Sequence, residues 1–318
     1  MANGKKGAPG KGRAFEISIL KFQITGGPRA SDVAFDAGGT NSASIMSTDN
    51  EKRPGIDSPP PSGGTADLLT EKARLIEPGE LAQWILHEDD DLLIINKPGG
   101  LVCHPSKNGP WSSLVGACRE RLRLPVIHLV HRLDRETSGL VVLAKHRKAA
   151  RITQMAFQNR QVEKIYLGIL AGDVPEPVRV DRKLARDMDS PVHIKQTVRD
   201  SRSAQTARTH FAPLARSGGF TLAAITPLTG RKHQIRVHAA WLGAPLVGDK
   251  IYGPDDRLYL EFIEHGWTPN LAAALLLPRQ ALHAWRLRFS APEYEASFTA
   301  PPPADLTTFC REHGLALP

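Results

Sequence analysis

Short apolar runs, each bounded by polar or turn-forming residues, recur along the chain after residue 80. Runs of this length that are rich in branched aliphatic side chains are typical of buried strands. Residues 84–86 and 92–96 flank a polar turn and predict a hairpin, and residues 281–292 and 294–301 predict a second hairpin. Further strands are predicted at residues 127–130, 140–144, 162–170, 208–212 and 220–226.

Fewer segments have the apolar spacing of helices, and these are residues 112–122, 146–161 and 232–242. In the second of them we expect the inward side to be formed by Ile152, Met155 and Ala156. In the third, the spacing predicts a core face of Ile235, Ala239 and Leu242, with Gly243 as the cap. The chain is therefore expected to be rich in strands and poor in helices.

The N-terminal quarter differs from the rest in composition. Residues 1–75 are dominated by Gly, Ser, Pro, Asp and Asn, and residues 58–64 read SPPPSGG. Such composition is typical of disordered segments and linkers. We therefore expect a largely disordered extension over residues 1–75, with a short strand within residues 15–25 as its exception, followed by one folded domain over residues 76–318.

The charge distribution points to a polyanionic partner. The chain of 318 residues has a formal net charge of +8, with ten basic and ten acidic residues before position 81. All of the excess positive charge is therefore carried by the predicted folded domain. A basic surface on a folded domain favours partners such as nucleic acid, although charge alone does not identify one.

Other classes of protein are disfavoured by the composition. The three cysteines form no CxxC pair, so neither a zinc site nor a disulfide framework is expected. No run of 18 apolar residues is present, and the first residues lack the apolar core of a secretory signal. We therefore expect a cytoplasmic protein that does not bind membranes.

A polar segment stands between two of the predicted strands and carries the candidate chemistry. Residues 131–135 read HRLDR and are followed by a Thr-Ser-Gly turn that ends at Gly139. Arg132 and Arg135 flank Asp134, and nearby positive charge favours an ionised carboxylate. An ionised Asp held at a strand end can act as a nucleophile or base. The alternative is a turn Asp in a structural ion pair, which is the commoner use of such a group.

The string HRLDRETSGL at residues 131–140 resembles the signature of the RluA-type pseudouridine synthases. Four further strings resemble segments of the same family in the same order: NKPGGLVCHP in residues 96–105, VEKIYLGIL in 162–170, LTGRKHQIRVHAAWLG in 228–243 and ALHAWRLRFSAP in 281–292. The resemblance covers roughly residues 84–300. Agreement of several separate motifs in order is a much more specific signal than one short motif.

The resemblance implies a fold and a reaction. The fold is the α+β pseudouridine synthase core, a mixed and mostly antiparallel sheet with flanking helices and a central active-site cleft. The reaction is the isomerisation of uridine to pseudouridine in structured RNA, most often ribosomal RNA, with transfer RNA as the alternative substrate. It needs no cofactor and no metal, and we expect a monomer. The small RNA-binding domain that many relatives carry at the N-terminus is expected to be absent.

The resemblance also implies roles for individual residues. Asp134 would be the nucleophile, and Arg236 would be the buried arginine that pairs with it, with Arg231 as the alternative. Tyr166 would stack on the uracil and could transfer a proton. Without the resemblance, Tyr166 would be interpreted as a core aromatic with a hydrogen-bonded hydroxyl group.

RNA-binding roles are expected for residues near these positions, because the target base must leave its stack before it reacts. Arg132 is the candidate that fills the gap left by the base. A phosphate contact and an ion pair with Asp134 are the alternative uses of Arg132. His131, Arg231 and His233 complete the expected RNA-binding set.

Two rival interpretations of the whole chain follow from the same residues. One is a non-catalytic RNA-binding relative of the family, which would keep the basic surface and lose Asp134, Tyr166 or Arg236; all three are present. The other is a basic globular protein in which the HRLD turn is only structural. The acidic run at residues 88–91 could suggest a metal site, but consecutive carboxylates in a turn are more often solvated.

Overall fold

The computed structural model describes residues 75–104, 108–292 and 294–318. The extension predicted over residues 1–75 and the strand predicted within residues 15–25 therefore lie outside the described residues, apart from residue 75 itself. The domain boundary predicted between residues 75 and 76 stays a prediction.

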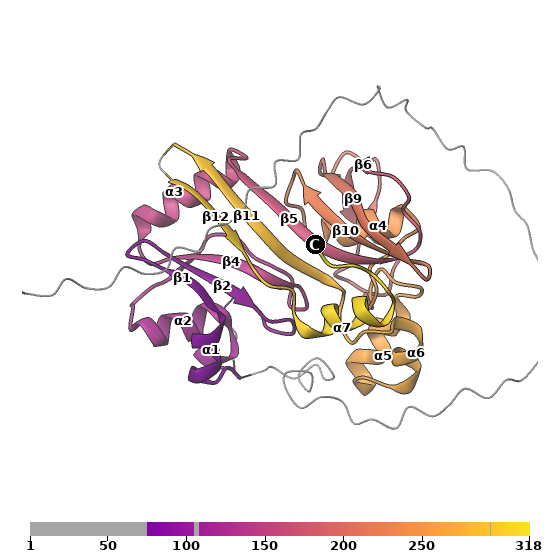
Figure 1. The fold of residues 1–318 in the computed structure, drawn as a ribbon, viewed down its shortest axis with the longest axis horizontal. Helices are drawn as coiled ribbons and strands as arrows, with labels where there is room; N and C mark the ends of the chain where they lie inside the picture. The colour runs from indigo at the N-terminus through magenta and orange to yellow at the C-terminus, as the bar shows by residue number, and fades with distance from the viewer. Residues whose placement is uncertain (1–74, 105–107, 293) are drawn as a thin grey trace, which may run out of the picture. The chain divides into compact units, whose positions relative to one another are not determined.

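One large sheet forms the centre of the described part (Figure 1). Its main strand order is β1 (Ile85–Glu88), β2 (Leu92–Lys97), β4 (Ser138–Ala144), β11 (Leu282–Ala291), β5 (Val162–Ala171), β10 (Phe220–Pro227), β9 (Arg208–Ser217) and β6 (Val178–Asp181). Within this sheet β11 and β4 are parallel, and the other described pairs are antiparallel. The predicted mixed, mostly antiparallel sheet is confirmed.

Three groups of short strands complete the sheet structure. β3 (His128–Leu129) pairs with β4, and β12 (Tyr294–Thr299) forms the predicted closing hairpin with β11. β7 (Leu184–Arg186) and β8 (Gln196–Val198) form a separate two-stranded sheet. The sequence analysis predicts no strand within residues 173–205, and the structure has β6, β7 and β8 there.

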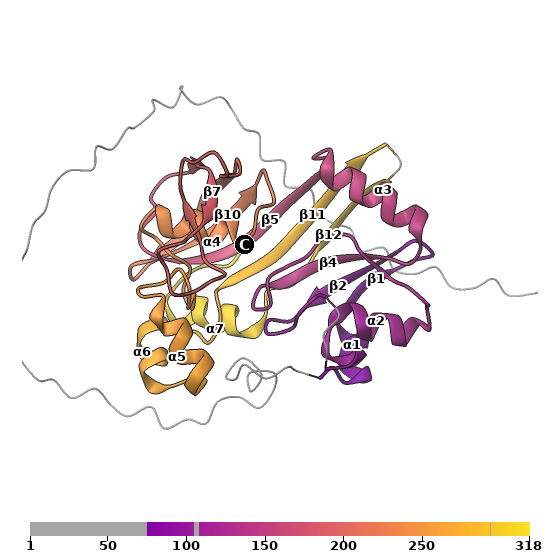
Figure 2. The same cartoon turned by 180° about the vertical axis from the view of Figure 1, so that it is seen from behind.

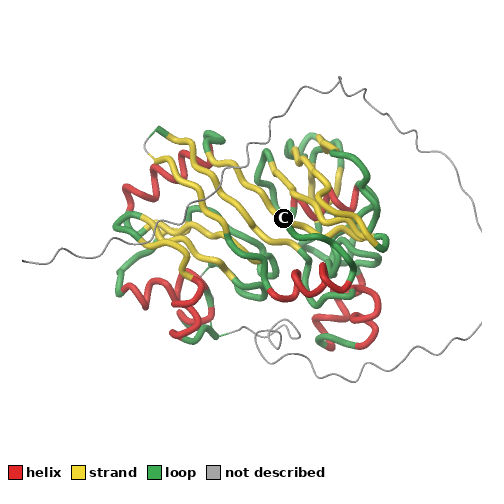
Figure 3. Tube along the Cα trace, in the orientation of Figure 1, coloured by secondary structure: helices red, strands yellow, loops and turns green. Residues whose placement is uncertain are grey.

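Helices lie at the margins of the described part, as Figure 3 shows. They are α1 (Pro78–Trp84), α2 (Leu114–Leu122), α3 (Arg147–Gln158), α4 (Gln234–Trp241), α5 (Arg257–His265), α6 (Pro269–Leu275) and α7 (Ala304–Glu312), with a 3₁₀ turn at Pro110–Ser112. The sequence reasoning missed α1, α6 and α7. All three begin at or just after prolines, which are favoured at helix starts. No helix in residues 75–104, 108–292 or 294–318 is long and apolar enough to cross a membrane.

The two faces of the sheet are covered by different helices. Side chains alternate along a strand, so Tyr166 and Leu170 of β5 point to one face and Ile169 to the other. Leu170 packs in one cluster with Ile235 and Ala239 of α4, and Tyr166 packs against that cluster. Ile169 packs with residues of α7 (Figures 1 and 2). The predicted core face of the third helix is therefore confirmed, and α4 lies on the Tyr166 face.

Helix α3 lies on the same face as α4. Its Phe157 contacts Phe289 of β11 edge to face, with ring centroids 5.8 Å apart. Phe289 is paired with Val162, which has the same orientation as Tyr166 four residues further along β5. The prediction that Met155 faces inward is wrong, because Met155 is 47% exposed and the buried stripe of α3 consists of Ala149, Ala150, Thr153 and Ala156.

Gly139, predicted to end a turn, lies inside β4 and has a φ of +107°. A Cβ atom at this position would lie 2.2 Å from the carbonyl oxygen of Ala284 in β11. The parallel contact between β4 and β11 pairs these two residues directly. Glycine is therefore required by close backbone approach as well as by conformation.

We predict that Gly139→Ala lowers the free energy of unfolding by about 3 kcal/mol, since it adds both backbone strain and a backbone clash. Denaturant unfolding measures this change. Gly79→Ala is the matched control, because a Cβ there meets no atom within 4 Å and Gly79 lies in α1. Equal stability of the two variants would contradict the close approach of β4 and β11.

Candidate active site

Asp134 lies in the loop that joins β3 to β4. The backbone N–H of Thr137 donates to the carbonyl oxygen of Asp134 at 3.2 Å, which closes the turn. Leu133 beside it is 6% exposed and belongs to the main core cluster. The Asp134 side chain, in contrast, is 30% exposed. Its carboxylate is therefore held by a buried neighbour and a closed turn while remaining open to solvent.

A buried arginine connects Asp134 to a second carboxylate. Arg236 Nη1 donates to Asp134 Oδ2 at 3.1 Å, while Nε and Nη2 donate to the two oxygens of Asp249 at 2.6 and 2.8 Å. Asp249 is fully buried and also accepts the backbone N–H groups of Ile251 and Tyr252, both at 3.0 Å. A two-point pair of this kind fixes the plane of the guanidinium group. One Nη1 donor is thereby directed at Asp134.

The charges of this pair stabilise each other. Burial opposes the charged form of Asp249, but the charge and hydrogen bonds of Arg236 outweigh it and lower the pKa of Asp249 below its usual value. Burial likewise opposes the cation of Arg236, and Asp249 outweighs that effect and raises the pKa of Arg236. Arg236 is thus held as a cation beside Asp134.

Arg236, and not the alternative Arg231, makes the contact with Asp134. Arg231 is exposed, and its Nε donates to the carbonyl oxygen of Thr206 at 3.1 Å. The expected RNA contact of Arg231 stays a prediction, and its exposure leaves it accessible. The spacing of the third motif predicts that Arg236 lies beside His233, outside the apolar stripe of α4. Arg236 is nevertheless one of the buried residues of α4, because its ion pair faces the interior.

Tyr166 lies on the sheet face that α4 covers. Burial and, after it, the negative charge of Asp134 raise the pKa of the Tyr166 hydroxyl group. Tyr166 is therefore a neutral phenol at physiological pH. It lies close enough to Asp134 for the carboxylate charge to oppose ionisation of the phenol. The structure brings together Asp134, Tyr166 and Arg236, which come from a loop, a strand and a helix far apart in the sequence.

The two predicted RNA-binding histidines are neutral. Burial, followed by the charge of Arg236, lowers the pKa of His233 to about 4. His233 Nδ1 lies 2.8 Å from Tyr252 Oη, and its Nε2 lies 3.9 Å from Asp134 Oδ2. Burial lowers the pKa of His131 to about 3, and His131 Nε2 accepts the backbone N–H of Val142 at 3.2 Å. Neither ring is available as a cation for phosphate, and any contact with RNA would be that of a neutral imidazole.

Arg132 is exposed, and the structure records no ion pair between it and Asp134. Of the uses considered for Arg132, the ion pair with the neighbouring carboxylate is therefore not made. Insertion into the RNA stack and contact with a phosphate both remain compatible with an exposed, flexible guanidinium group. The structure places Arg132 two residues from Asp134 on the same loop.

Sequence reasoning missed the cation that holds this loop in place. Lys97 at the end of β2 is fully buried, and its Nζ donates to the carbonyl oxygens of Pro98, Leu101 and Arg135 at 2.8, 2.9 and 3.0 Å. Burial lowers the pKa of Lys97 to about 8. The NKPGG string identified the segment, but a lysine before a Pro-Gly turn is usually solvated. Its three carbonyl acceptors are visible only in the folded chain.

A second set of missed residues supports the other side of the loop. Lys250 Nζ donates to Glu136 Oε1 at 2.6 Å, and Arg279 Nη1 donates to the Glu136 carbonyl oxygen at 3.1 Å. Arg279 is also paired with Asp305 of α7, Nε to Oδ2 at 2.6 Å. The loop that carries Asp134 is thus tied to α7 on the opposite face of the sheet.

Lys164 is a further cation on the active-site face. It lies two residues before Tyr166 on β5, and its ammonium group lies beside Gly230 in the segment that leads into α4. Burial lowers the pKa of Lys164. The described residues include no recorded ion-pair partner for it. No cluster of three potential metal-ligating side chains occurs in the described part either.

Comparison with known proteins gives a consistent set of relatives. Residues 91–241 match a family model described as RNA pseudouridylate synthase. The chain is 38% identical over 217 residues to the ribosomal large subunit pseudouridine synthase D of Nitrosomonas europaea, covering 65% of this chain and 58% of that protein. It is 34% identical over 258 residues to the uncharacterized RNA pseudouridine synthase YhcT of Bacillus subtilis, covering 78% of each.

A solved structure is similar over most of its length. The structure titled Human RNA Pseudouridylate Synthase Domain Containing 4 has a TM-score of 0.62 and 29% identity, covering 76% of this chain and 97% of the other. The match to the Nitrosomonas protein and its Neisseria meningitidis counterpart spans only 58% and 60% of those relatives.

We predict that Asp249→Asn lowers the free energy of unfolding at pH 7 by about 3–5 kcal/mol. The substitution leaves the buried cation of Arg236 with only one of its two carboxylate partners. The lowered pKa of Asp249 sets the pH dependence. Its stabilising contribution is present above the unfolded pKa of about 4 and is lost as the pH falls through the lower folded pKa. The difference between wild type and variant should therefore shrink below about pH 4.

Denaturant unfolding at a series of pH values measures this difference. Asp189→Asn is the control, because Asp189 is an exposed aspartate paired with Arg199 on the surface. A difference between wild type and Asp249→Asn that stays constant down to pH 2 would refute the assignment of the charge to Asp249.

Proposed function

The chain belongs to the RluA-type family of RNA pseudouridine synthases, and on that premise we propose that it isomerises uridine to pseudouridine in structured RNA, with large-subunit ribosomal RNA as the substrate. The observation that carries the proposal is the contact of Arg236 Nη1 with Asp134 Oδ2 at 3.1 Å, combined with the 30% exposure of the Asp134 side chain. A carboxylate that is oriented and yet reachable by substrate is what the reaction requires.

The chemistry explains why these groups suffice. The bond between the ribose and N1 of uracil breaks, the ribose is rejoined to carbon five, the hydrogen on carbon five leaves as a proton, and N1 takes up a proton in exchange. No electrons or groups enter or leave in the overall reaction. Asp134 acts first, by adding to the sugar, by adding to carbon six or by promoting an elimination, and Arg236 orients it.

Tyr166 and Arg132 take the remaining roles in this proposal. Tyr166, neutral and beside Asp134, packs against the uracil and supplies a proton donor. Arg132, exposed on the same loop, occupies the space that the extruded base leaves in the RNA. Lys164, without a recorded partner among the described residues, is suited to a phosphate of the target nucleotide.

The choice of RNA rests on the named relatives. Two of the relatives most similar over their aligned regions are named as synthases of the large ribosomal subunit. Because the chain spans 58% and 60% of those two proteins, the substrate is part of our proposal.

Tritium release tests the reaction directly, because formation of the new carbon–carbon bond expels the hydrogen on carbon five. Large-subunit ribosomal RNA transcribed with uridine tritiated at carbon five is incubated with wild type, Asp134→Ala or Asp173→Ala. We expect release by the wild type and the control and none by Asp134→Ala. Asp173 is the matched control, since it is an exposed aspartate paired with Arg216.

Release by Asp134→Ala at the wild-type rate would remove Asp134 from the mechanism. Release from transfer RNA, with none from ribosomal RNA, would change the substrate and keep the reaction. Absence of release from both RNAs by correctly folded wild type would favour a non-catalytic RNA-binding protein.

We predict that Tyr166→Phe lowers kcat by about 10²–10⁴-fold, the range expected when a proton donor is lost, and leaves KM nearly unchanged because the ring still stacks. Since the pKa of Tyr166 is raised, the wild-type rate should show no loss from phenol ionisation between pH 7 and 9. Steady-state tritium release over this pH range measures both effects. Wild-type kcat in Tyr166→Phe would limit Tyr166 to stacking.

A further inference from the structure

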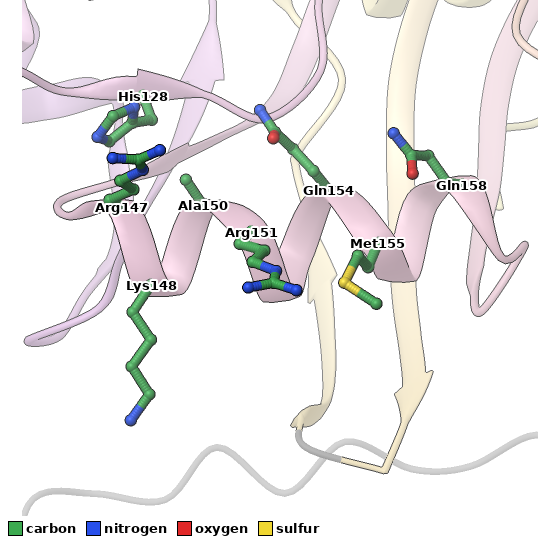
Figure 4. A pocket seen from close by; sticks show the side chains of 8 residues that line it. All are labelled: His128, Arg147, Lys148, Ala150, Arg151, Gln154, Met155 and Gln158. Atoms are coloured by element: carbon green, nitrogen blue, oxygen red, sulfur yellow. The ribbon is translucent and has the colours of Figure 1, made fainter.

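A hollow lies beside α3, away from the residues that surround Asp134. Figure 4 shows the side chains that line it, and they come from α3 and from β3. They are His128, Arg147, Lys148, Ala150, Arg151, Gln154, Met155 and Gln158. We call these eight residues the α3 surface. Its volume of about 960 Å³ would admit a small molecule, but apart from the imidazole of His128 it has no aromatic ring, and it has no branched aliphatic side chain of the kind that lines small-molecule pockets.

The three cations of the α3 surface are exposed and uncompensated. Arg147, Lys148 and Arg151 lie within five positions of one helix, and the described residues include no recorded ion-pair partner for any of them. No acidic residue lines the hollow. The nearest preceding basic residues are already paired with acids, Lys145 with Glu88 at 3.0 Å and His146 with Asp91 at 2.7 Å. The surface therefore keeps its full positive charge.

The α3 surface belongs to the same face of the sheet as the candidate active site. Phe157 of α3, one position before Gln158, stacks on His131 with ring centroids 4.7 Å apart. His131 precedes Asp134 by three residues on the same loop. His128, which lines the hollow, is six residues from Asp134, so the two Cα atoms lie within about 22 Å of each other.

A polyanion that enters the active site can therefore reach the α3 surface. A separation of at most about 22 Å corresponds to about six or seven stacked bases, at about 3.4 Å for each. Arg, Lys and Gln side chains are the common partners of phosphate oxygens in nucleic-acid complexes. The α3 surface is open to solvent, because Met155 is exposed and no wall encloses the hollow.

We propose that the α3 surface binds the phosphate backbone of the substrate RNA, several nucleotides away from the uridine that enters the Asp134 site. This inference rests on the proposed function for the identity of the RNA. Phosphate contacts position an RNA without reading its sequence, so the α3 surface contributes to affinity for any structured RNA. It contributes to KM and leaves the chemical step at Asp134 unchanged.

The test uses the full chain with Arg147→Gln, Lys148→Gln and Arg151→Gln combined. Glutamine keeps a helix propensity close to that of Arg and Lys. The matched control is Arg119→Gln, Arg121→Gln and Arg123→Gln, which removes the same charge at and just after α2, across β1 and β2 from α3 in Figures 1 and 2. Circular dichroism melting of each variant confirms that it is folded before binding is measured.

The probe is large-subunit ribosomal RNA transcribed in vitro. For the α3 variant we expect Kd at 150 mM salt to rise at least about tenfold, and the slope of log Kd against log salt concentration to fall by about 2–3, as the loss of three phosphate contacts requires. We expect kcat at saturating RNA to equal that of the wild type. The α2 control should keep the wild-type Kd and slope.

Each contrary result has a distinct meaning. Wild-type Kd and salt slope in the α3 variant would overturn the inference while leaving the proposed function intact. An equal loss in the α2 control would also overturn it, because net charge alone would then explain binding. Retained RNA binding with lost binding to vesicles of phosphatidylglycerol would reassign the surface to membranes. Absence of tritium release by the wild type refutes the proposed function, whereas the binding measurements still decide the role of the α3 surface.

Discussion

The buried pair of Arg236 and Asp249 is the interaction on which the candidate site depends. Two parallel hydrogen bonds, at 2.6 and 2.8 Å, hold the guanidinium plane, and two backbone N–H groups hold the carboxylate in turn. An unpaired charge in this position would be strongly destabilising, so each member is required for the other. Nη1, the nitrogen that this pair leaves unused, is then directed toward Asp134. Without Asp249, Arg236 would lack a fixed orientation.

Other buried cations hold the loop around Asp134 in the same way, by donating hydrogen bonds from fixed positions. Lys97 binds three backbone carbonyl groups, one of them at Arg135, and Lys250 binds the Glu136 carboxylate. A loop lacks the ladder of hydrogen bonds that holds a strand, so its backbone groups need other partners. Fully buried side chains supply these hydrogen-bond partners, and they thereby hold the loop in a single conformation. The geometry of the candidate site is thus maintained by buried residues that lie behind the Asp134 loop.

The alternation of side chains along β5 places the candidate site and the α3 surface on one face of the sheet. Tyr166 and Lys164 share that face with α4, and α3 packs on it through Phe157 and Phe289. Helix α7 covers the opposite face and reaches the Asp134 loop through Arg279. In our proposal, the face with α3 and α4 meets the RNA, and the face with α7 supports the Asp134 loop.

The sequence by itself determined the strands of the central sheet other than β6, the turn at Asp134 and the family, because these depend on local periodicity and on continuous motifs. Periodicity placed the core face of the α4 segment correctly, since Ile235 and Ala239 are spaced for one helix side. It failed for Met155, because an unbranched apolar side chain at the edge of a stripe can face either way.

Only the tertiary structure decided which partners meet. The sequence left Arg231 and Arg236 as alternatives for Asp134, and the choice depends on Asp249, which lies 13 positions beyond Arg236 and 115 beyond Asp134. The same holds for the neutral state of His131 and His233, which burial imposes. Pairings across such separations and the cost of burial are properties of the packed chain, so a linear pattern of residues carries no direct signal for them.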